Sequence, residues 1–531
     1  MRRRNATVGC LLGLLMAYVV FYAVVLHPDR KQIQAVTTTR TVAFSKVKAA
    51  NTNITVTVDK AAQMQKSPDK TVGSSSLPED VRLNFVLILI DDLGWKDLAC
   101  YGNTFHETPN IDRLASQGMK FTQAYASAPV CSPTRGAILT GRYPARTRVT
   151  DWIPGYSVGN SKPMRPPEWT KHLPLEEHSL AHALAGAGYV SASIGKWHLG
   201  GPTFWPLGQN FSVNIGGCDM GQPPTYWSPY GIPTLPDGPK GEYLTDRLTL
   251  EAIKFINESK EQPFFLYLSH YAVHEPIEAK KDLIDKYEEK AKKEKLHPKP
   301  NTAYAAMLES VDDGVGAVIA TLNKLMLSNR TVVFFASDNG GLIQVTSNAP
   351  LRAGKGSVYE GAYRVPFITT FPGVVPPNTI SYTPVNSVDL FPTILEMAGI
   401  DLGDYKYLDG VSLVPEFLQQ APLKPRSLFW HYPHYHIIGG ATPFGAVRQG
   451  DMKLIEFYED NRVELYNLTA DIGETKDLSK SMPDKVVSLR DDLGKWRSCV
   501  NAQMPDRNQN QENMKDKRKK KRKFGNIPLK K

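Results

Sequence analysis

The hydrophobic positions along the chain predict buried strands that alternate with amphipathic helices. Continuous apolar runs, typical of strands buried on both faces, occupy residues 84–90, 189–194, 264–268 and 331–336. Between these runs, apolar residues recur every three or four positions, as they do at residues 244–255 and 307–322. The alternation predicts an α/β fold in which helices surround a mostly parallel sheet.

A smaller unit is predicted toward the C-terminus. Short strand-like pieces, separated by turn residues, lie at residues 444–448, 453–458 and 463–466. A helical pattern follows at residues 483–499. These pieces predict a small antiparallel sheet with one helix. We therefore expect a large domain at residues 83–415 and a C-terminal subdomain at residues 416–500.

The N-terminal part of the chain predicts a membrane anchor. Residues 8–26 form an apolar or weakly polar run that is about long enough to cross a bilayer. Three arginines precede it, so residues 1–7 are expected in the cytosol and the rest of the chain in the lumen. We expect a single-pass type II membrane protein of the secretory pathway, with a flexible stem at residues 27–82. A cleaved signal peptide, which would give a secreted or lysosomal protein, is the alternative.

The net charge of +10 is concentrated at the C-terminus. Residues 515–531 hold ten basic residues and one acidic residue, a charge of +9, so the remaining residues sum to about +1. We expect residues 501–531 to be a disordered basic tail. Outside the cytosol, the seven consecutive cations Lys517–Lys523 would bind sulfated glycosaminoglycans, and no nucleic-acid partner is expected. A solvated end without a partner is the alternative.

The segment from Cys131 to Arg135 reads Cys-Ser-Pro-Thr-Arg. A cysteine phosphatase needs five residues between its cysteine and arginine, and a run of backbone N–H groups around the anion. Here there are three, and Pro133 has no N–H group to donate. The spacing therefore excludes that class and matches the sulfatase signature Cys-x-Pro-x-Arg. A buried cysteine beside a helix start is the alternative for the pentapeptide alone.

Two acidic or amide pairs follow predicted strands. Asp91 and Asp92 come directly after the first strand, and Asp338 and Asn339 follow the strand at residues 331–336. The carboxyl ends of parallel strands are where open α/β sheets bind ligands. Each pair alone would fit a turn or a helix cap, but together they predict a site for Ca²⁺, with Mg²⁺ as the alternative ion.

Cationic and histidine side chains complete the candidate chemistry. A sulfate ester breaks with negative charge on three oxygens, so its site needs fixed cations and a proton donor for the leaving alcohol. The candidates are Arg135, Lys196, His198, His274 and Lys355. Lys196 and His198 stand two residues apart after a strand, where alternate side chains face the same side.

The order of these motifs resembles the type I sulfatases. The match is closest to the arylsulfatase A, arylsulfatase B and N-acetylgalactosamine-6-sulfatase kind, and it covers about residues 83–500. The resemblance implies an alkaline phosphatase-like fold. It also implies that a formylglycine-generating enzyme oxidises Cys131 to formylglycine, whose hydrate attacks sulfur.

The resemblance further implies a role for each candidate. Ca²⁺ would be held by Asp91, Asp92, Asp338, Asn339 and formylglycine 131. Asp338 would also deprotonate the hydrate, which Arg135 and Lys196 would hold. His198 would take the second hydroxyl proton and so expel sulfate. Lys355 and His274 would bind sulfate, and one of them would protonate the leaving alcohol.

The expected function is therefore hydrolysis of sulfate esters of carbohydrates or glycosaminoglycans, with aryl sulfates as artificial substrates. A phosphate or phosphonate monoester hydrolase on the same scaffold is one alternative. A catalytically dead protein that binds polyanions is the other. A dead site would lack its nucleophile or a ligand, and this sequence lacks neither.

Overall fold

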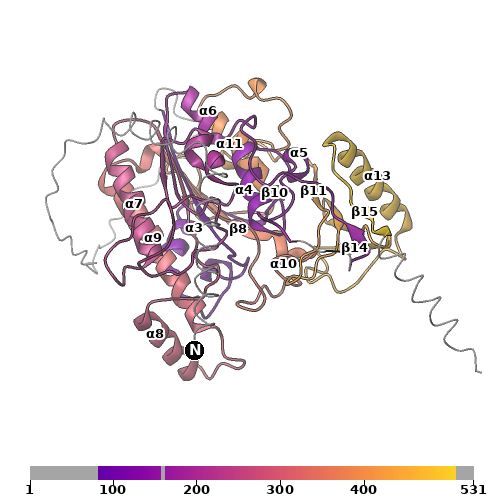
Figure 1. Cartoon of the computed structure of the whole chain (residues 1–531), viewed down its shortest axis with the longest axis horizontal. Coiled ribbons are helices and arrows are strands. Elements are labelled where there is room, and N and C mark those ends of the chain that lie inside the picture. Colours follow the sequence, from indigo (N-terminus) through magenta and orange to yellow (C-terminus); the bar gives the residue numbers. More distant parts are fainter. Residues whose placement is uncertain (1–81, 157–158, 160–161, 510–531) are drawn as a thin grey trace, which may run out of the picture. The chain divides into compact units, whose positions relative to one another are not determined.

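The computed structural model describes residues 82–156, 159 and 162–509 (Figure 1). The expected anchor at residues 8–26, all but the last residue of the expected stem, and the cationic run at 517–523 lie outside these ranges. Within the described ranges, no helix is both long and apolar enough to cross a membrane.

A nine-stranded sheet forms the centre of the molecule. Its strands are β1 (Asn84–Ile90), β2 (Met119–Tyr125), β4 (Val190–Gly195), β5 (Val213–Ile215), β6 (Phe264–Ser269), β7 (Thr331–Ser337), β8 (Arg364–Thr370), β9 (Thr379–Ser381) and β10 (Val385–Asn386). The order is β10-β2-β8-β7-β1-β6-β4-β5, and β9 also pairs with β2. Strand β8 runs antiparallel to its neighbours β2 and β7, whereas the other pairs are parallel.

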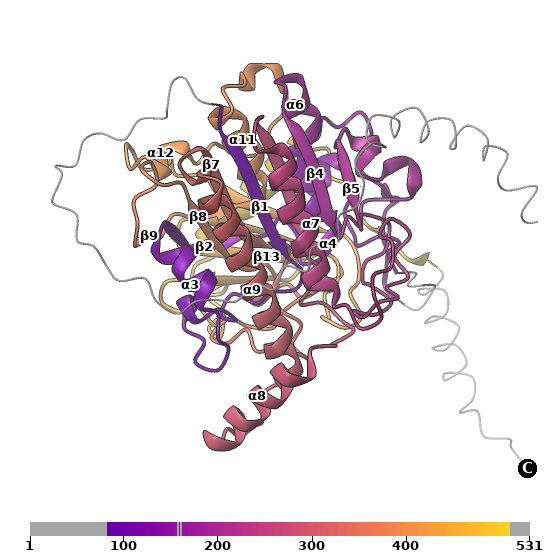
Figure 2. The ribbon, with the colours of Figure 1, turned by 90° about the vertical axis from the view of Figure 1, so that its left-hand side faces the viewer.

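Helices cover both faces of this sheet, because alternate residues of a strand point to opposite faces. The core on one face contains Val86 and Ile88 of β1. Helices α3 (Pro109–Ser116), α7 (Leu244–Ser259) and α9 (Thr302–Lys324) contribute to that core, and α8 (Lys281–Lys293) packs on α9. Figure 2 shows α7 and α9 in front of the strands on this face.

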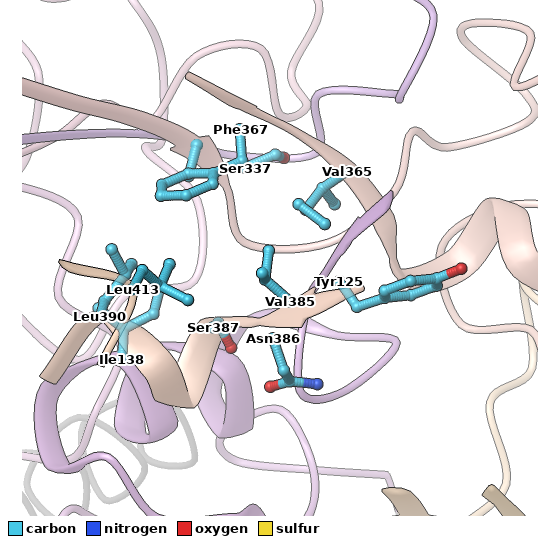
Figure 3. Close-up of a pocket in the computed structure, with 12 residues that line it drawn as sticks. Tyr125, Ile138, Ser337, Val365, Phe367, Val385, Asn386, Ser387, Leu390 and Leu413 are labelled. Carbon is cyan, nitrogen blue, oxygen red and sulfur yellow. The ribbon is translucent and has the colours of Figure 1, made fainter. Parts of the chain in front are cut away.

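The opposite face carries a second core, which contains Phe85, Leu87 and Leu89 of β1. Helices α4 (Cys131–Thr140), α6 (Leu180–Gly186) and α11 (Leu390–Met397) contribute to it. A small cavity of about 20 Å³, room for about one water molecule, lies where α4 and α11 meet β8 and β10 (Figure 3). None of the predicted site residues lines this cavity, so the chemistry must be sought elsewhere.

The C-terminal part forms a separate four-stranded antiparallel sheet. Its strands, in spatial order, are β11 (Ser427–Tyr432), β12 (Phe444–Gln449), β13 (Met452–Phe457) and β14 (Val463–Asn467). Helix α13 (Pro483–Cys499) lies beside this sheet (Figure 1). Its Leu489 and Leu493 pack on one face of the sheet. On the other face, Trp430 stacks on Tyr363 of the larger domain at 4.8 Å between ring centroids.

The predicted fold class is confirmed by these two sheets and their helices. The boundary between the domains at residue 416 stays a prediction. The described part of the expected tail, residues 501–509, includes a short strand, because β15 (Asp506–Arg507) pairs with β3 (Met164–Arg165). That pairing holds Asp506 and Arg507 against β3 of the larger domain.

Candidate active site

The predicted site residues come together at one edge of the central sheet. Strands β1 and β7 are parallel neighbours, so Asp91 and Asp92 after β1 meet Asp338 and Asn339 after β7. Lys196 follows β4 on the same edge. This convergence is what the rule for parallel sheets predicts.

Cys131 is the first residue of α4 and is buried. Its Sγ atom lies 3.5 Å from Oδ1 of Asp91, to which it donates a hydrogen bond. Burial raises the pKa of the Cys131 thiol to about 12, although Lys196 and Lys355 act in the opposite direction. The unmodified side chain is therefore a thiol at neutral pH and a poor nucleophile, since thiol reactivity belongs to the thiolate.

Arg135 lies one helical turn further along α4 and is fully buried. Its Nε and Nη2 atoms contact Oδ2 of Asp338 at 2.9 and 2.8 Å, which fixes the plane of the guanidinium group. Its Nη1 atom donates to Oγ of Ser269 at 2.6 Å and to the backbone carbonyl of Lys196 at 3.0 Å. A planar guanidinium group that forms several hydrogen bonds holds anionic groups in fixed orientations.

Lys196 reaches the same cluster from β4. Its Nζ atom contacts Oδ2 of Asp91 at 2.6 Å, and both side chains are fully buried. The preceding Gly195 has a φ of 98°, and a Cβ atom there would lie 1.9 Å from the carbonyl oxygen of Ser269. Glycine is therefore required for Lys196 to approach the neighbouring strand so closely.

His198 is held as a neutral base. Its Nε2 atom lies 2.5 Å from the carbonyl oxygen of Ile153. Because a carbonyl oxygen can only accept a hydrogen bond, Nε2 must carry the hydrogen. Its Nδ1 atom is buried and has no hydrogen-bond partner among the described residues. Burial, followed by the charge of Lys196, holds the pKa of His198 well below its ordinary value. The side chain thus offers one free lone pair.

Lys355 and His274 form the opposite wall of the cluster. Nζ of Lys355 contacts Oδ1 and Oδ2 of Asp92 at 2.8 Å and Nε2 of His274 at 2.9 Å. Burial, together with the charge of Lys355, lowers the pKa of His274 to about 3, so this histidine is neutral at neutral pH. The charge of Asp92 outweighs burial at Lys355 and raises the pKa of that ammonium group.

The carboxylates of Asp91, Asp92 and Asp338 balance the charges of Arg135, Lys196 and Lys355. Burial alone would raise the pKa of Asp92, but Lys355 and His274 hold it well below its ordinary value. The pKa of Asp338 is raised by burial and then by the neighbouring charge of Asp91. The carboxylates of Asp91 and Asp338 repel each other, and a bound cation would relieve that repulsion.

The donor atoms fit a hard cation. Ligand atoms of Asp91, Asp92, Cys131 and His274 lie within 4.8 Å of one another. Oδ1 of Asn339 is buried without a hydrogen-bond partner among the described residues, as expected of an oxygen that awaits a ligand. The lone pair of His274 Nε2 already faces the ammonium group of Lys355. The oxygen atoms are therefore the better candidates, and oxygen is what Ca²⁺ prefers.

The cluster opens into a pocket of about 440 Å³. Among the predicted residues, Asp92, Cys131, His198, His274 and Lys355 line it, whereas Arg135 and Lys196 lie behind them. The predicted set is thus brought together in full, as an inner layer of paired charges and an outer layer that faces the pocket.

Sequence reasoning missed other residues of this region. The carbonyl of Ile153 and the hydroxyl of Ser269 position His198 and Arg135, and neither contact has a sequence signal. His436 lines the pocket from the loop between β11 and β12. Three of the twelve histidines fall between residues 431 and 436, and that concentration was the available signal.

Known protein families and individual proteins match this sequence. The sulfatase family model matches residues 83–400, and a model for the C-terminal part of N-sulphoglucosamine sulphohydrolase matches residues 354–497. A sulfatase of Formosa agariphila is 33% identical over 81% of this chain and 92% of its own length. The N-acetylgalactosamine-6-sulfatase of Homo sapiens is 33% identical over 68% of this chain and 70% of its own.

A solved structure agrees with these sequence relatives. The crystal structure of Ps i-CgsB superposes with a TM-score of 0.67 at 28% identity and covers 78% of this chain and 93% of its own. The match of the family model to more than half of the chain includes each of the predicted site residues. The chain belongs to the sulfatase family and is a sulfuric ester hydrolase.

Proposed function

We propose that the protein hydrolyses sulfate esters of carbohydrates, with formylglycine at position 131 as its nucleophile and Ca²⁺ as its metal ion. The state of Cys131 carries this proposal. A thiol with a pKa near 12 cannot attack sulfur as a thiolate at neutral pH, yet it stands where the carboxylates and cations converge. Oxidation to an aldehyde, which hydrates to a geminal diol, would give this position a usable oxygen nucleophile.

The ligands of the ion would be Asp91, Asp92, Asp338, Asn339 and the residue at position 131. When bound, Ca²⁺ would supply positive charge that stabilises the oxygens of the nucleophile and of sulfate. The Oδ1 atom of Asn339, which is buried and has no hydrogen-bond partner in the described part of the chain, supports this assignment.

Fixed cations would hold the reacting groups. Arg135 and Lys196 lie behind position 131 and would orient the diol, while Lys355 and His274 face the pocket and would bind the sulfate oxygens. Because these groups are already fixed by hydrogen bonds to carboxylates and carbonyls, little reorganisation is needed when charge develops.

In the first half-reaction, Asp338 accepts a proton from one hydroxyl of the diol as its oxygen attacks sulfur. The bond from sulfur to the ester oxygen breaks, and the leaving alcohol takes a proton from Lys355 or His274. Lys355 is the member of that pair that carries a proton at neutral pH, given the low pKa of His274.

In the second half-reaction, His198 accepts the proton of the remaining hydroxyl through its free Nδ1 lone pair. The aldehyde re-forms as the carbon–oxygen bond to sulfate breaks, and water then restores the diol. The net reaction consumes one water and yields an alcohol, sulfate and a proton. The neutral, singly hydrogen-bonded state of His198 supports this role.

The names of the relatives support the substrate class. One is an N-acetylgalactosamine-6-sulfatase, whose name describes a sulfated sugar as its substrate. Transfer of this substrate class to the present chain is part of the proposal.

The experiment is a comparison of 4-nitrophenyl sulfate with 4-nitrophenyl phosphate, using protein made in cells with the formylglycine-generating enzyme. We expect hydrolysis of the sulfate, loss of activity after Ca²⁺ removal, and no activity in Cys131→Ala. Cys499→Ala, which changes an exposed cysteine, is the matched control. Preferential hydrolysis of the phosphate would favour the alternative monoester hydrolase.

A further inference from the structure

The outer part of the active-site pocket differs in character from its charged floor. Trp152, Met220, Leu342 and Ile438 contribute apolar surface to its walls, and Ile438 is 57% exposed. These side chains come from four separate segments of the chain. They line the same pocket as Cys131 and Lys355, which the sulfate must reach.

The same walls carry negative rather than positive charge. Asp219 and Glu275 line the pocket, both are exposed, and neither forms an ion pair with a described residue. Among the described residues that line the pocket, Lys355 is the single lysine or arginine, and it already contacts Asp92 and His274.

His436 adds no positive charge to these walls. Its Nδ1 atom accepts a hydrogen bond from the backbone N–H group of Gly439 at 2.9 Å, so its proton is on Nε2. Burial, with the charge of Lys355, lowers the pKa of His436 to about 4, so the ring is neutral at neutral pH. It therefore presents a neutral donor to the pocket.

We propose that this outer pocket selects a leaving alcohol that carries no second anionic group and offers an apolar face beside the scissile sulfate. This inference rests on the proposed sulfatase function and specifies its substrate. It favours sulfate esters of sugars or aryl alcohols whose only charge is the scissile sulfate over the interior of a densely charged glycosaminoglycan.

The selection follows from charge and from apolar contact. A carboxylate or second sulfate in the outer pocket would lie near Asp219 and Glu275 without a cation to offset their repulsion. An uncharged ring would instead remove apolar surface of Trp152, Met220 and Ile438 from water, which is favourable.

A matched pair of fluorogenic substrates tests the proposal. The first is 7-sulfooxycoumarin-4-acetate, and the second is its methyl ester, which differs by one remote negative charge and leaves nearly the same phenol. At low ionic strength we expect kcat/KM of the ester to exceed that of the carboxylate by about fivefold or more. Raising the salt concentration should reduce the ratio, because exposed charges are screened.

Two variants assign the effect to the pocket. The double change Asp219→Asn with Glu275→Gln should bring the ratio of the two substrates close to one. Ile438→Ser should raise the KM of the methyl ester about threefold, because one apolar wall is lost. Glu396→Gln, which neutralises an exposed carboxylate on α11 away from the pocket, should leave the ratio unchanged.

The outcomes separate this inference from the proposed function. Equal or faster hydrolysis of the carboxylate at low salt would overturn the inference and leave the sulfatase function intact. A ratio that survives in the double variant would show that Asp219 and Glu275 are not its cause and would also overturn the inference. Failure to hydrolyse either sulfate, with formylglycine and Ca²⁺ present, would overturn both.

Discussion

The carboxylate of Asp338 accepts hydrogen bonds from two neighbouring residues. Its Oδ2 atom receives the guanidinium group of Arg135, and its Oδ1 atom accepts a hydrogen bond from the backbone of Asp92 at 3.2 Å. Burial and the charge of Asp91 raise its pKa, which makes it a stronger base than an exposed aspartate. A raised pKa suits a general base, because proton transfer is most efficient when the pKa of the base lies near the operating pH.

Asp338→Asn should therefore reduce kcat by about 10²- to 10⁴-fold, because the base is removed. Ca²⁺ affinity should fall in the same variant, which calorimetric titration would measure. Asp404→Asn, an exposed aspartate, is the control and should match the wild type. Lost turnover with unchanged Ca²⁺ affinity would contradict the role of Asp338 as a ligand.

At His198 the expected defect lies in a different step. His198→Ala removes the free Nδ1 lone pair that the second half-reaction needs, so turnover should stop after sulfate has been transferred to the enzyme. Mass spectrometry during a single turnover should detect a sulfated enzyme. A slower steady-state rate without that adduct would show that His198 does not expel sulfate.

Asp151 is a buried carboxyl group that titrates near neutrality. Its Oδ1 atom accepts hydrogen bonds from Tyr432 and from the backbone of Trp152, and His434 faces its Oδ2 atom at 3.8 Å. Burial raises the pKa of Asp151 to about 7, an effect that these hydrogen bonds and Lys171 only partly offset. The pKa of His434 is lowered to about 3 by burial, so this neighbour stays neutral.

The pKa of Asp151 predicts how stability depends on pH. Between about pH 4 and pH 7 the folded protein keeps a proton that the unfolded chain has released. The stability that this proton contributes is therefore lost as the pH rises through that window. Asp151→Asn keeps the acceptor oxygen but cannot ionise, so its unfolding temperature should rise relative to the wild type from pH 4 to pH 7. If the unfolding temperatures of the two proteins differed by the same amount at every pH from 4 to 7, the raised pKa of Asp151 would be contradicted.

At the scale of elements, buried charges join the C-terminal sheet to the larger domain. Nζ of Lys453 on β13 contacts Oε1 of Glu360 at 3.0 Å and Oε1 of Glu474 at 2.7 Å, and the three side chains are buried. Glu360 opens α10 (Glu360–Tyr363), which directly precedes β8. Arg364 also contacts Glu360 at 3.5 Å, whereas Lys453 is the one cation that pairs with Glu474 among the described residues. An unpaired charge in the interior is strongly unfavourable.

Lys453→Met should lower the free energy of unfolding by about 3–5 kcal/mol, because two buried carboxylates would face each other. Thermal unfolding and the yield of folded protein would measure this loss. Lys495→Met removes an exposed partner of Asp491 on α13 and should change neither quantity measurably. A wild-type unfolding temperature for Lys453→Met would contradict the structural role of the cluster.

Sequence patterns predicted the buried elements best. The bounds of β1 and α13 agree with prediction, because a continuous apolar run and a proline at a helix start are strong local signals. Strand β2 was missed because polar residues such as Lys120, Thr122 and Gln123 interrupt it. The antiparallel direction of β8 is set by pairing across the sheet, which no local pattern encodes.

The sequence predicted those site residues that act through their side chains and belong to motifs. The rule for strand ends placed Asp91, Asp92, Asp338 and Asn339 together, as the structure does. The carbonyl of Ile153 was beyond prediction, because any residue offers the same backbone group. The walls of the pocket, such as Asp219 and Ile438, come from loops whose conformations depend on tertiary packing.

At the scale of the whole molecule, the pocket combines both parts of the fold. Its floor belongs to the central sheet, whereas His436 and Ile438 come from the loop between two strands of the C-terminal sheet. That loop is held against the larger domain, because the N–H group of Ala441 donates to the carbonyl of Gly356 at 3.1 Å. The position of the C-terminal sheet therefore affects the shape of the pocket that binds the leaving group.

The modification of Cys131 tests the central claim most directly. The measurement is the mass of the tryptic peptide that ends at Arg135, from active protein made in cells with the formylglycine-generating enzyme. We predict that residue 131 has lost sulfur and two hydrogens and gained one oxygen, and that specific activity scales with the modified fraction. Full activity in a preparation that carries only unmodified Cys131 would contradict the proposed mechanism.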